Sequence, residues 1–123
     1  MLDLQREQGL RVPAKAAFSN WRLFPDPRKG EYLWAPFGPG CYDLRERDTG
    51  RLVLFGSGGN VCERMASLLP APFGTGTRKN AAKREYVLRN LGRIEYRTLA
   101  CADRKAAKQA EVALSAGDYL FKT

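Results

Sequence analysis

One stretch, residues 40–69, constrains the fold of this 123-residue chain more than any other. Residues 41–46 alternate apolar and polar side chains, as a half-buried strand does. The Asp-Thr-Gly sequence at 48–50 supplies tight-turn chemistry, and a second apolar run follows at 52–55. The stretch therefore predicts an antiparallel hairpin near the middle of the chain.

The hairpin is followed by a glycine-rich corner, residues 56–59, and then by a helical pattern. The apolar residues at helical spacing are Val61, Met65, Leu68 and Leu69. Either Ser57 or Asn60 is a suitable N-cap for this helix. Because such a corner leaves backbone N–H groups pointing outward, we expect an anion to be welcome there.

Arg64 is the first unusual residue of this helix. It lies three residues after Val61 and four before Leu68, so the spacing predicts that it shares their apolar face. A guanidinium on that face needs a partner, which is either structural or a substrate.

The charge balance indicates a polyanionic partner, most often nucleic acid. Lys and Arg number 21 against 13 Asp and Glu, a formal charge of +8. No run approaches the ~18–20 apolar residues of a membrane span, and the charged N-terminus does not resemble a signal peptide. Three separated cysteines and no histidine argue against a zinc site, so we expect reduced thiols and a cytoplasmic protein without membrane contact.

Composition divides the chain into an arm at 1–39 and a domain at 40–123. The arm interleaves prolines with large apolar residues, which are Phe18, Trp21, Leu23, Phe24, Tyr32, Leu33, Trp34 and Phe37. We favour the interpretation that these side chains cover the sheet. Stacking on nucleic-acid bases beside Arg22, Arg28 and Lys29 is the alternative, and a dimer formed through the arm is also left open.

A loop rich in Pro and Gly, 70–77, precedes a predicted helix over 78–92 that Gly92 ends. Nearly all charged residues of this helix are basic, namely Arg78, Lys79, Lys83, Arg84 and Arg89. A run of like charge is either a solvated face or a phosphate-binding face, and both interpretations stand.

Residues 94–99 alternate as a third strand, and Asp103 is a predicted N-cap for a last helix. Glu111 lies four residues after Ala107 and three before Leu114, so this carboxylate is also predicted on a packing face. The element order is β-β-α-α-β-α, which predicts an α/β (α+β) domain with helices packed on one small sheet.

Arg64 and Glu111 therefore stand as opposite charges on two helices that pack on the same sheet. One interpretation is a buried salt bridge. The other is a phosphate-binding Arg64 beside a metal-binding Glu111, with Tyr42 as a hydroxyl donor or base. Phosphodiester hydrolysis needs these parts, because a hard cation prefers carboxylate oxygen and the transition state needs added positive charge.

These residues resemble the GIY-YIG nucleases. Gly40-Cys41-Tyr42 resembles the first family triplet and Leu54-Phe55-Gly56 the second. The small residue, Asn and Arg that follow in the family match Ser57 or Gly58, Asn60 and Arg64, and the family's metal-binding Glu resembles Glu111. The similarity covers about two thirds of the chain, from Gly40 onward, with the motifs in the family's order.

The resemblance implies a small central three-stranded antiparallel sheet flanked by helices, and hydrolysis of DNA phosphodiesters with Mg or Mn. It implies that Tyr42 positions or deprotonates the attacking water, that Arg64 binds the phosphate and that Glu111 holds the metal. Basic residues of the second helix, with Ser57 and Asn60, would contact DNA.

This sequence departs from the family at three positions: Leu54 replaces the second-triplet tyrosine, Leu68 a common His or Tyr, and Thr123 a late Asn. A catalytically impaired nucleic-acid-binding module on the same fold is therefore the alternative function. A third hypothesis is a protein-interaction module that uses the aromatic arm.

Overall fold

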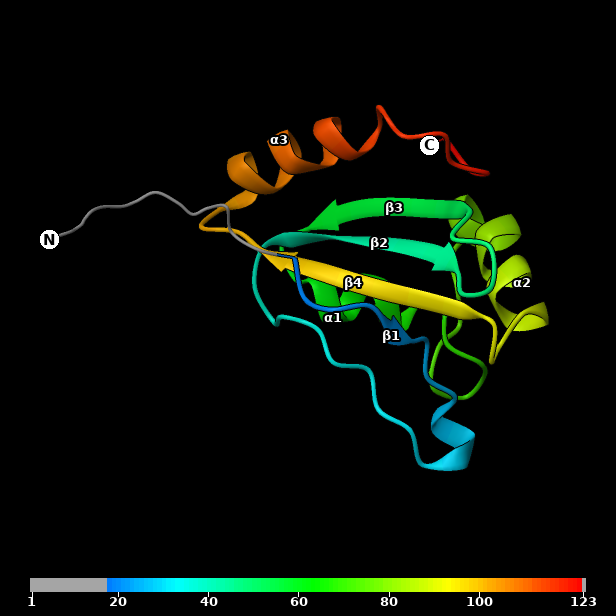
Figure 1. Ribbon diagram of the computed structural model, residues 1–123. Helices are drawn as coiled ribbons and strands as arrows, with labels where there is room; N and C mark the ends of the chain where they lie inside the picture. Colours follow the sequence, from blue (N-terminus) through cyan, green and yellow to red (C-terminus); the bar gives the residue numbers. More distant parts are fainter. Residues whose placement is uncertain (1–17, 123) are drawn as a thin grey trace, which may run out of the picture.

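The computed structural model describes residues 18–122. The first part of the arm and Thr123, where the family's late Asn would fall, lie outside the described residues. The elements in chain order are β1 (Arg22–Leu23), the 3-10 helix η2 (Pro27–Lys29), β2 (Gly40–Glu46), β3 (Leu52–Gly58), α1 (Val61–Ala66), the 3-10 helix η3 (Arg78–Asn80), α2 (Ala81–Arg89), β4 (Ile94–Ala100) and α3 (Arg104–Leu114) (Figure 1). From Gly40 onward this confirms the β-β-α-α-β-α order and the α+β class.

The sheet is antiparallel and has four strands, in the order β1-β4-β2-β3. The sequence predicts three, and the fourth is the short β1, which comes from the arm and pairs Arg22 with Tyr96 and Leu23 with Glu95. A strand of two residues carries no alternation from which it could be predicted. β2 occupies the centre between β3 and β4, so β3 is an edge strand.

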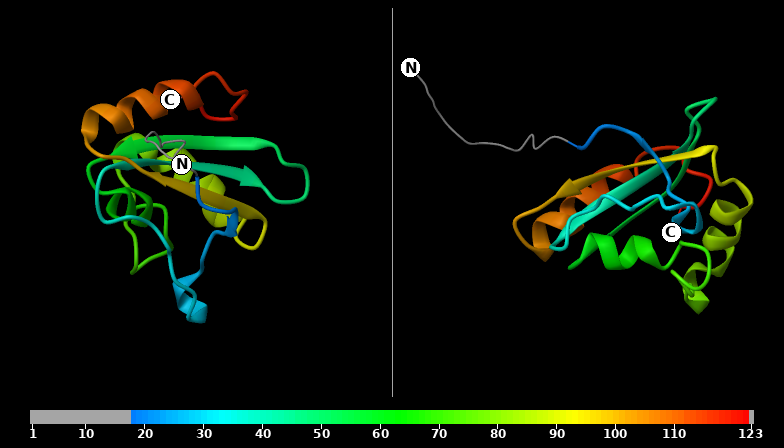
Figure 2. Two further views of the ribbon diagram at one scale, coloured as in Figure 1. Left: turned by 60° about the vertical axis from the view of Figure 1, so that its left-hand side comes forward. Right: turned by 90° about the horizontal axis from the view of Figure 1, so that it is seen from below.

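Helices cover the two faces of the sheet unequally. α3 lies along one face, over β2 and β3, and α1 lies against the other (Figures 1 and 2). Tyr42 and Leu44 belong to the core cluster that also contains Val61 and Met65 of α1. Because successive side chains of a strand alternate, Asp43 points to the opposite face, where the buried Tyr119 follows α3. Each face of β2 is therefore buried.

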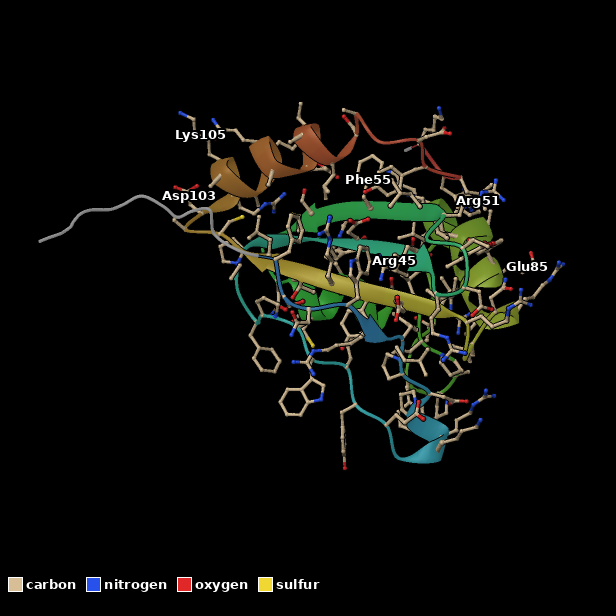
Figure 3. The ribbon with its side chains drawn as sticks, in the orientation of Figure 1. Arg45, Arg51, Phe55, Glu85, Asp103 and Lys105 are labelled. Atoms are coloured by element: carbon tan, nitrogen blue, oxygen red, sulfur yellow. The ribbon has the colours of Figure 1, made fainter. Side chains whose placement is uncertain are left out.

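The arm contributes to the core through its first described part. Phe24 is 1% exposed and packs edge-to-face on Tyr96, with ring centroids 5.8 Å apart. Trp21 lies under the guanidinium of Arg45, whose carbon is 4.1 Å from the centroid of the Trp21 ring. Arg45 is labelled in Figure 3. The prediction that the large apolar side chains of the arm cover the sheet is thus confirmed for Phe24 and Trp21. It is wrong for Tyr32, Trp34 and Phe37, which are exposed.

The helix boundaries follow the predicted capping residues. Asn60 is the N-cap of α1 and accepts the Glu63 N–H at 3.0 Å, and Asp103 caps α3 by accepting the Ala106 N–H at 2.8 Å. The predicted helix at 78–92 is instead divided into η3 and the shorter α2. In residues 18–122, no helix has both the length and the apolar character needed to cross a membrane.

We expect Phe24→Ala to lower the free energy of unfolding by about 3–5 kcal/mol, because it removes a fully buried aromatic side chain from the core. Leu23→Ala, at the neighbouring half-exposed position, serves as the control and should cost much less. Urea denaturation of both variants measures the difference. Equal, small losses would mean that the arm does not belong to the core.

Candidate active site

Tyr42 lies on the central strand directly opposite Gly56 of β3. Its ring lies over the backbone of that edge strand at Gly56. A Cβ placed on Gly56 would overlap the Tyr42 hydroxyl and would lie 2.5 Å from Cζ. The glycine of the second triplet therefore provides the space that the tyrosine of the first triplet occupies.

Arg64 uses a second glycine of the same strand in the same way. A Cβ on Gly58 would lie 2.6 Å from Arg64 Cγ and 3.2 Å from Cδ. The stem of Arg64 thus lies against the backbone at the end of β3. Two glycines at alternate positions of one edge strand bring a tyrosine from β2 and an arginine from α1 to the same place.

The prediction that Arg64 shares the packing face of its helix is wrong. Val61 and Met65 are fully buried, whereas Arg64 is exposed. The physical reason is that a long side chain can lay its apolar stem along the protein while its charged head stays in water. Arg64 does this at the border of the buried face, against Gly58.

Burial controls the chemistry of the Tyr42 hydroxyl. The pKa of Tyr42 is raised, chiefly because burial disfavours the charged phenolate. The nearby Arg64 guanidinium opposes this rise in the pKa, and the Glu111 carboxylate adds to it. Tyr42 is therefore a neutral hydroxyl at physiological pH, able to donate one hydrogen bond and to accept others.

The carboxylate of Glu111, on α3, raises the pKa of both Tyr42 and Lys83. Its side chain is 22% exposed, and Oε1 accepts from Lys108 Nζ at 3.0 Å within the same helix. Within residues 18–122, no ion pair joins Glu111 to Arg64, so of the two interpretations of these charges the buried salt bridge is wrong. Arg64 lies exposed against Gly58 instead.

Lys83 belongs to the same group of side chains. It is half-buried, and its pKa is lowered chiefly by burial. Glu111 raises the Lys83 pKa and Arg64 lowers it, so both charges lie close to the amine. The sequence predicts Lys83 only as part of a basic helix face, and no local pattern connects it with Tyr42. We call Tyr42, Arg64, Lys83 and Glu111 the Tyr42 cluster.

Three of the predicted DNA contacts have structural roles. Ser57 is buried on the α3 face of the sheet, opposite the face that carries Tyr42 and Arg64. Arg84 donates to the carbonyl of Leu69 from Nε at 3.2 Å and Nη2 at 2.9 Å, and Nη2 also donates to Gly74 at 2.9 Å. Arg84 thus holds the loop before η3, and Asn60 caps α1. We leave Ser57 and Arg84 out of the proposed DNA contacts.

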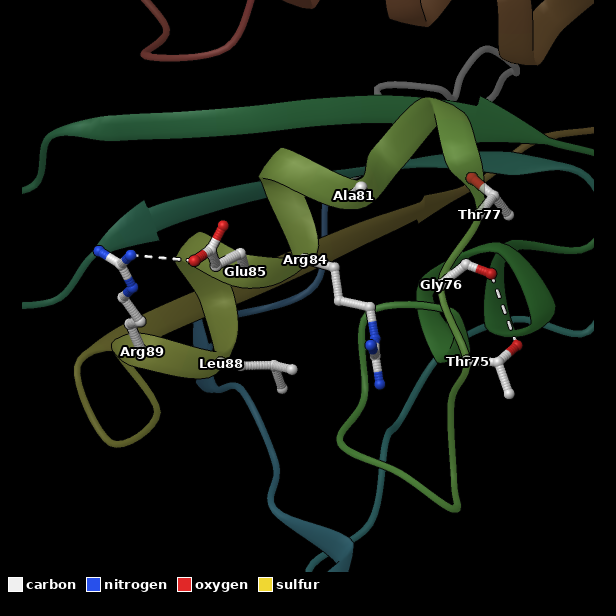
Figure 4. Close-up of a pocket in the computed structure, with 8 residues that line it drawn as sticks. All are labelled: Thr75, Gly76, Thr77, Ala81, Arg84, Glu85, Leu88 and Arg89. Atoms are coloured by element: carbon white, nitrogen blue, oxygen red, sulfur yellow. Dashed lines mark hydrogen bonds and ion pairs between the residues drawn. The ribbon is translucent and has the colours of Figure 1, made fainter.

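Arg78, Lys79 and Arg89 are exposed. Arg89 pairs with Glu85 at 2.9 Å, and both side chains are largely solvated. A pocket on this side of α2 is lined by Thr75, Gly76, Thr77, Ala81, Arg84, Glu85, Leu88 and Arg89 (Figure 4). It contains no member of the Tyr42 cluster, and its arginines have the partners just described.

Glu111 is the candidate metal ligand. Among the described residues, no group of three or more His, Cys, Asp or Glu side chains could hold a metal ion. The donor set still fits Mg or Mn, because Mg commonly uses one or two carboxylates and completes its shell with water and substrate phosphate. The partly exposed Glu111 supplies one such carboxylate, next to cations suited to a phosphate.

Leu54 and Leu68 are both buried in the core. At the positions where the resemblance leads one to expect polar side chains, the protein has apolar packing instead. No family model, curated protein or solved structure matches this chain.

We expect Gly56→Ala to cost about 1–3 kcal/mol of folding free energy, because the new methyl group meets the Tyr42 ring. In a Tyr42→Ala background the same change should cost little, which a double-mutant cycle from denaturation curves measures. Gly59→Ala is the control, since its Cβ would meet only the flexible Arg104 side chain, at 3.3 Å from Cδ. A cycle without coupling would place Tyr42 elsewhere.

The ionisation of Lys83 tests the cluster directly. Because Glu111 raises the Lys83 pKa and Arg64 lowers it, Glu111→Gln should lower that pKa further and Arg64→Ala should raise it. NMR titration of the Lys83 side-chain carbon next to the amine measures both shifts, with the exposed Lys79 as internal control. Shifts of the opposite sign, or equal shifts at Lys79, would contradict the arrangement.

Proposed function

We propose that this protein is a metal-dependent endonuclease that hydrolyses DNA phosphodiester bonds, related to the GIY-YIG nucleases. The observation that carries the proposal is the approach of Tyr42 from β2 and Arg64 from α1 to Gly56 and Gly58 of the edge strand β3, with the Glu111 carboxylate of α3 close enough to raise the pKa of Tyr42. These are the residues that match the family motif, and they are far apart in the sequence.

In this proposal Arg64 and Lys83 bind the scissile phosphate. The Arg64 charge lowers the pKa of Lys83, and within residues 18–122 neither cation forms an ion pair with an acid. Positive charge held in place before the reaction stabilises the additional negative charge of the transition state. Lys83 is thus a fourth site residue beyond those of the motif.

Tyr42 orients the attacking water. Because burial raises its pKa, the phenol keeps its proton at neutral pH and is a poor base. Of the two roles that the resemblance implies for this tyrosine, positioning of the nucleophile therefore fits the electrostatics better than deprotonation. A hydrogen-bonding hydroxyl in a buried, rigid position suits that role.

Glu111 would hold the Mg or Mn ion, which when bound supplies Lewis-acid stabilisation of the phosphate oxygens. The net charge of +8 supports DNA as the polyanionic substrate. Exposed basic residues outside the cluster would contact the DNA backbone, namely Arg78, Lys79 and Arg89. The setting we propose is the cytoplasm, where the thiols of Cys41, Cys62 and Cys101 stay reduced, in keeping with their unpaired state.

One observation favours a second candidate, a nucleic-acid-binding module that does not cut. Leu54 and Leu68 are core residues, so neither position adds a polar group to the site, and Glu111 is already engaged by Lys108. Such a module would bind DNA in a salt-dependent way without need for Mg or Mn. Replacement of Glu111 by Gln would leave its binding unchanged.

We expect Arg64→Ala to reduce cleavage by about 100-fold or more, because it removes a charge that stabilises the transition state. The fold should change little, since Arg64 is exposed. Arg51→Ala, an exposed arginine at the far end of the hairpin, is the matched control. Plasmid nicking and cleavage of branched DNA with Mg or Mn measure the rates, and equal activity of Arg64→Ala would refute the mechanism.

Glu111→Ala should abolish metal-dependent cutting, whereas Glu85→Ala, which removes an exposed carboxylate of α2, should not. The same two assays compare these variants with the wild type. If the wild type binds DNA and cuts none of the substrates with either metal, the endonuclease proposal fails and the binding module replaces it.

A further inference from the structure

The arm exposes three large aromatic side chains close together in the sequence. Tyr32 is 76% exposed, Trp34 64% and Phe37 81%. We call these three residues the aromatic row. Large exposed aromatic groups in one short segment mark a binding surface more often than a solvated one. The sequence favours the interpretation that these residues cover the sheet, and the structure shows that they are exposed instead.

The backbone that carries the aromatic row is anchored. The Trp34 N–H donates to the hydroxyl of the buried Tyr96 at 2.8 Å. Leu33 and Ala35 alternate with the exposed residues and pack against the core. The row therefore lies on an anchored segment. Binding a ligand there should cost little conformational entropy of the protein.

Cations accompany the aromatic rings. The Arg22 guanidinium carbon lies 5.9 Å from the centroid of the Trp34 ring. Arg28 and Lys29 of η2 come just before the row and are exposed. Arg28 pairs with Asp26 at 2.9 Å, and Glu31 accepts the Asp26 N–H at 2.8 Å, so Arg22 and Lys29 are the cations that we expect to meet phosphates. Exposed rings flanked by cations suit stacked bases with phosphates between them.

The segment that carries the row also contacts the start of α1, the helix that contains Arg64 of the Tyr42 cluster. The carbonyls of Pro36 and Gly38 accept the N–H groups of Cys62 at 2.9 Å and Val61 at 3.1 Å, at the start of α1. Arg64 lies in that helix, and the arm continues directly into β2, which carries Tyr42. In Figure 1 this segment runs along the side of the sheet where α1 lies.

We propose that the aromatic row binds single-stranded DNA adjacent to the bond that is cut, so that the preferred substrates have a single-stranded flank. Binding of single-stranded DNA by the row does not depend on the proposed function; only its position next to a cleaved bond rests on that function. Duplex DNA cannot use the row in this way, because its bases are already stacked on one another. Association of two copies through these rings is the competing explanation.

The test measures binding of fluorescein-labelled oligothymidylate by fluorescence anisotropy, at low salt and with a chelator so that no cleavage can occur. Replacement of Tyr32, Trp34 and Phe37 together by Ala should weaken binding by about 10-fold or more, since each stacked base contributes appreciably. Phe73→Ala, an exposed aromatic outside the row, is the matched control and should bind as the wild type does. Because the three residues are exposed, thermal unfolding should be unchanged.

A duplex of the same length provides the second measurement. The triple variant should bind the duplex almost as well as the wild type does. Equal weakening for duplex and oligothymidylate, or no weakening for either, would overturn the inference. A wild-type dimer in sedimentation that the triple variant abolishes, with oligothymidylate binding unchanged, would also overturn it in favour of self-association.

These outcomes are separate from those that test the proposed function. If the row binds oligothymidylate and the protein cuts no DNA with Mg or Mn, the endonuclease proposal fails while the binding surface stands. If the protein cuts DNA and the triple variant prefers the same substrates as the wild type, the row is not part of substrate choice and the inference fails alone.

Discussion

The buried carboxylate of Asp43 is the interaction on which the rest of the structure depends. It lies fully buried on the central strand, where an unpaired charge would cost far more than the fold could offset. Its partners come from distant parts of the chain: the Tyr119 hydroxyl donates at 2.7 Å and Arg97 Nε at 3.0 Å. Arg97 in turn lies over the rings of Phe18 and Trp21, at 4.1 and 4.6 Å. One carboxylate thus connects β2, β4, the C-terminal segment and the arm.

This network lies on the α3 face of the sheet, whereas the candidate site lies on the other face, at the edge strand β3. Gly56 and Gly58 have no side chains there, and Tyr42 and Arg64 occupy the space that side chains would take. An edge strand normally carries features that protect it from pairing with other chains. Here the small residues at its end let Tyr42 of β2 and Arg64 of α1, on the same face of the sheet, lie against its backbone. The candidate site depends on these two glycines, because any larger residue would overlap Tyr42 at position 56 or Arg64 at position 58.

The sequence predicts the elements of this fold well where local patterns determine them. Alternation, turn residues and caps were sufficient for β2, β3 and β4 and for the starts of α1 and α3. β1 could not be predicted because two residues have no periodicity. The prediction for Arg64 was wrong because helical spacing gives only the direction of the Cα–Cβ bond. The long arginine side chain can bend so that its guanidinium remains in solvent. Lys83 is held near Glu111 by tertiary packing alone, and no spacing along the chain encodes that proximity.

The charges of the Tyr42 cluster favour a functional role over a structural one. Burial is the main reason why the pKa of Lys83 is lowered; the second cation, Arg64, lowers it further, and the Glu111 carboxylate opposes both effects. The carboxylate nearby does not form an ion pair with Arg64, since Lys108 of its own helix holds it. A purely structural group of charges would be arranged to neutralise itself, as Asp43 and Arg97 are. Within residues 18–122, Arg64 and Lys83 form no ion pair, so two cations lie beside the buried Tyr42 hydroxyl, which supports the proposed phosphate site.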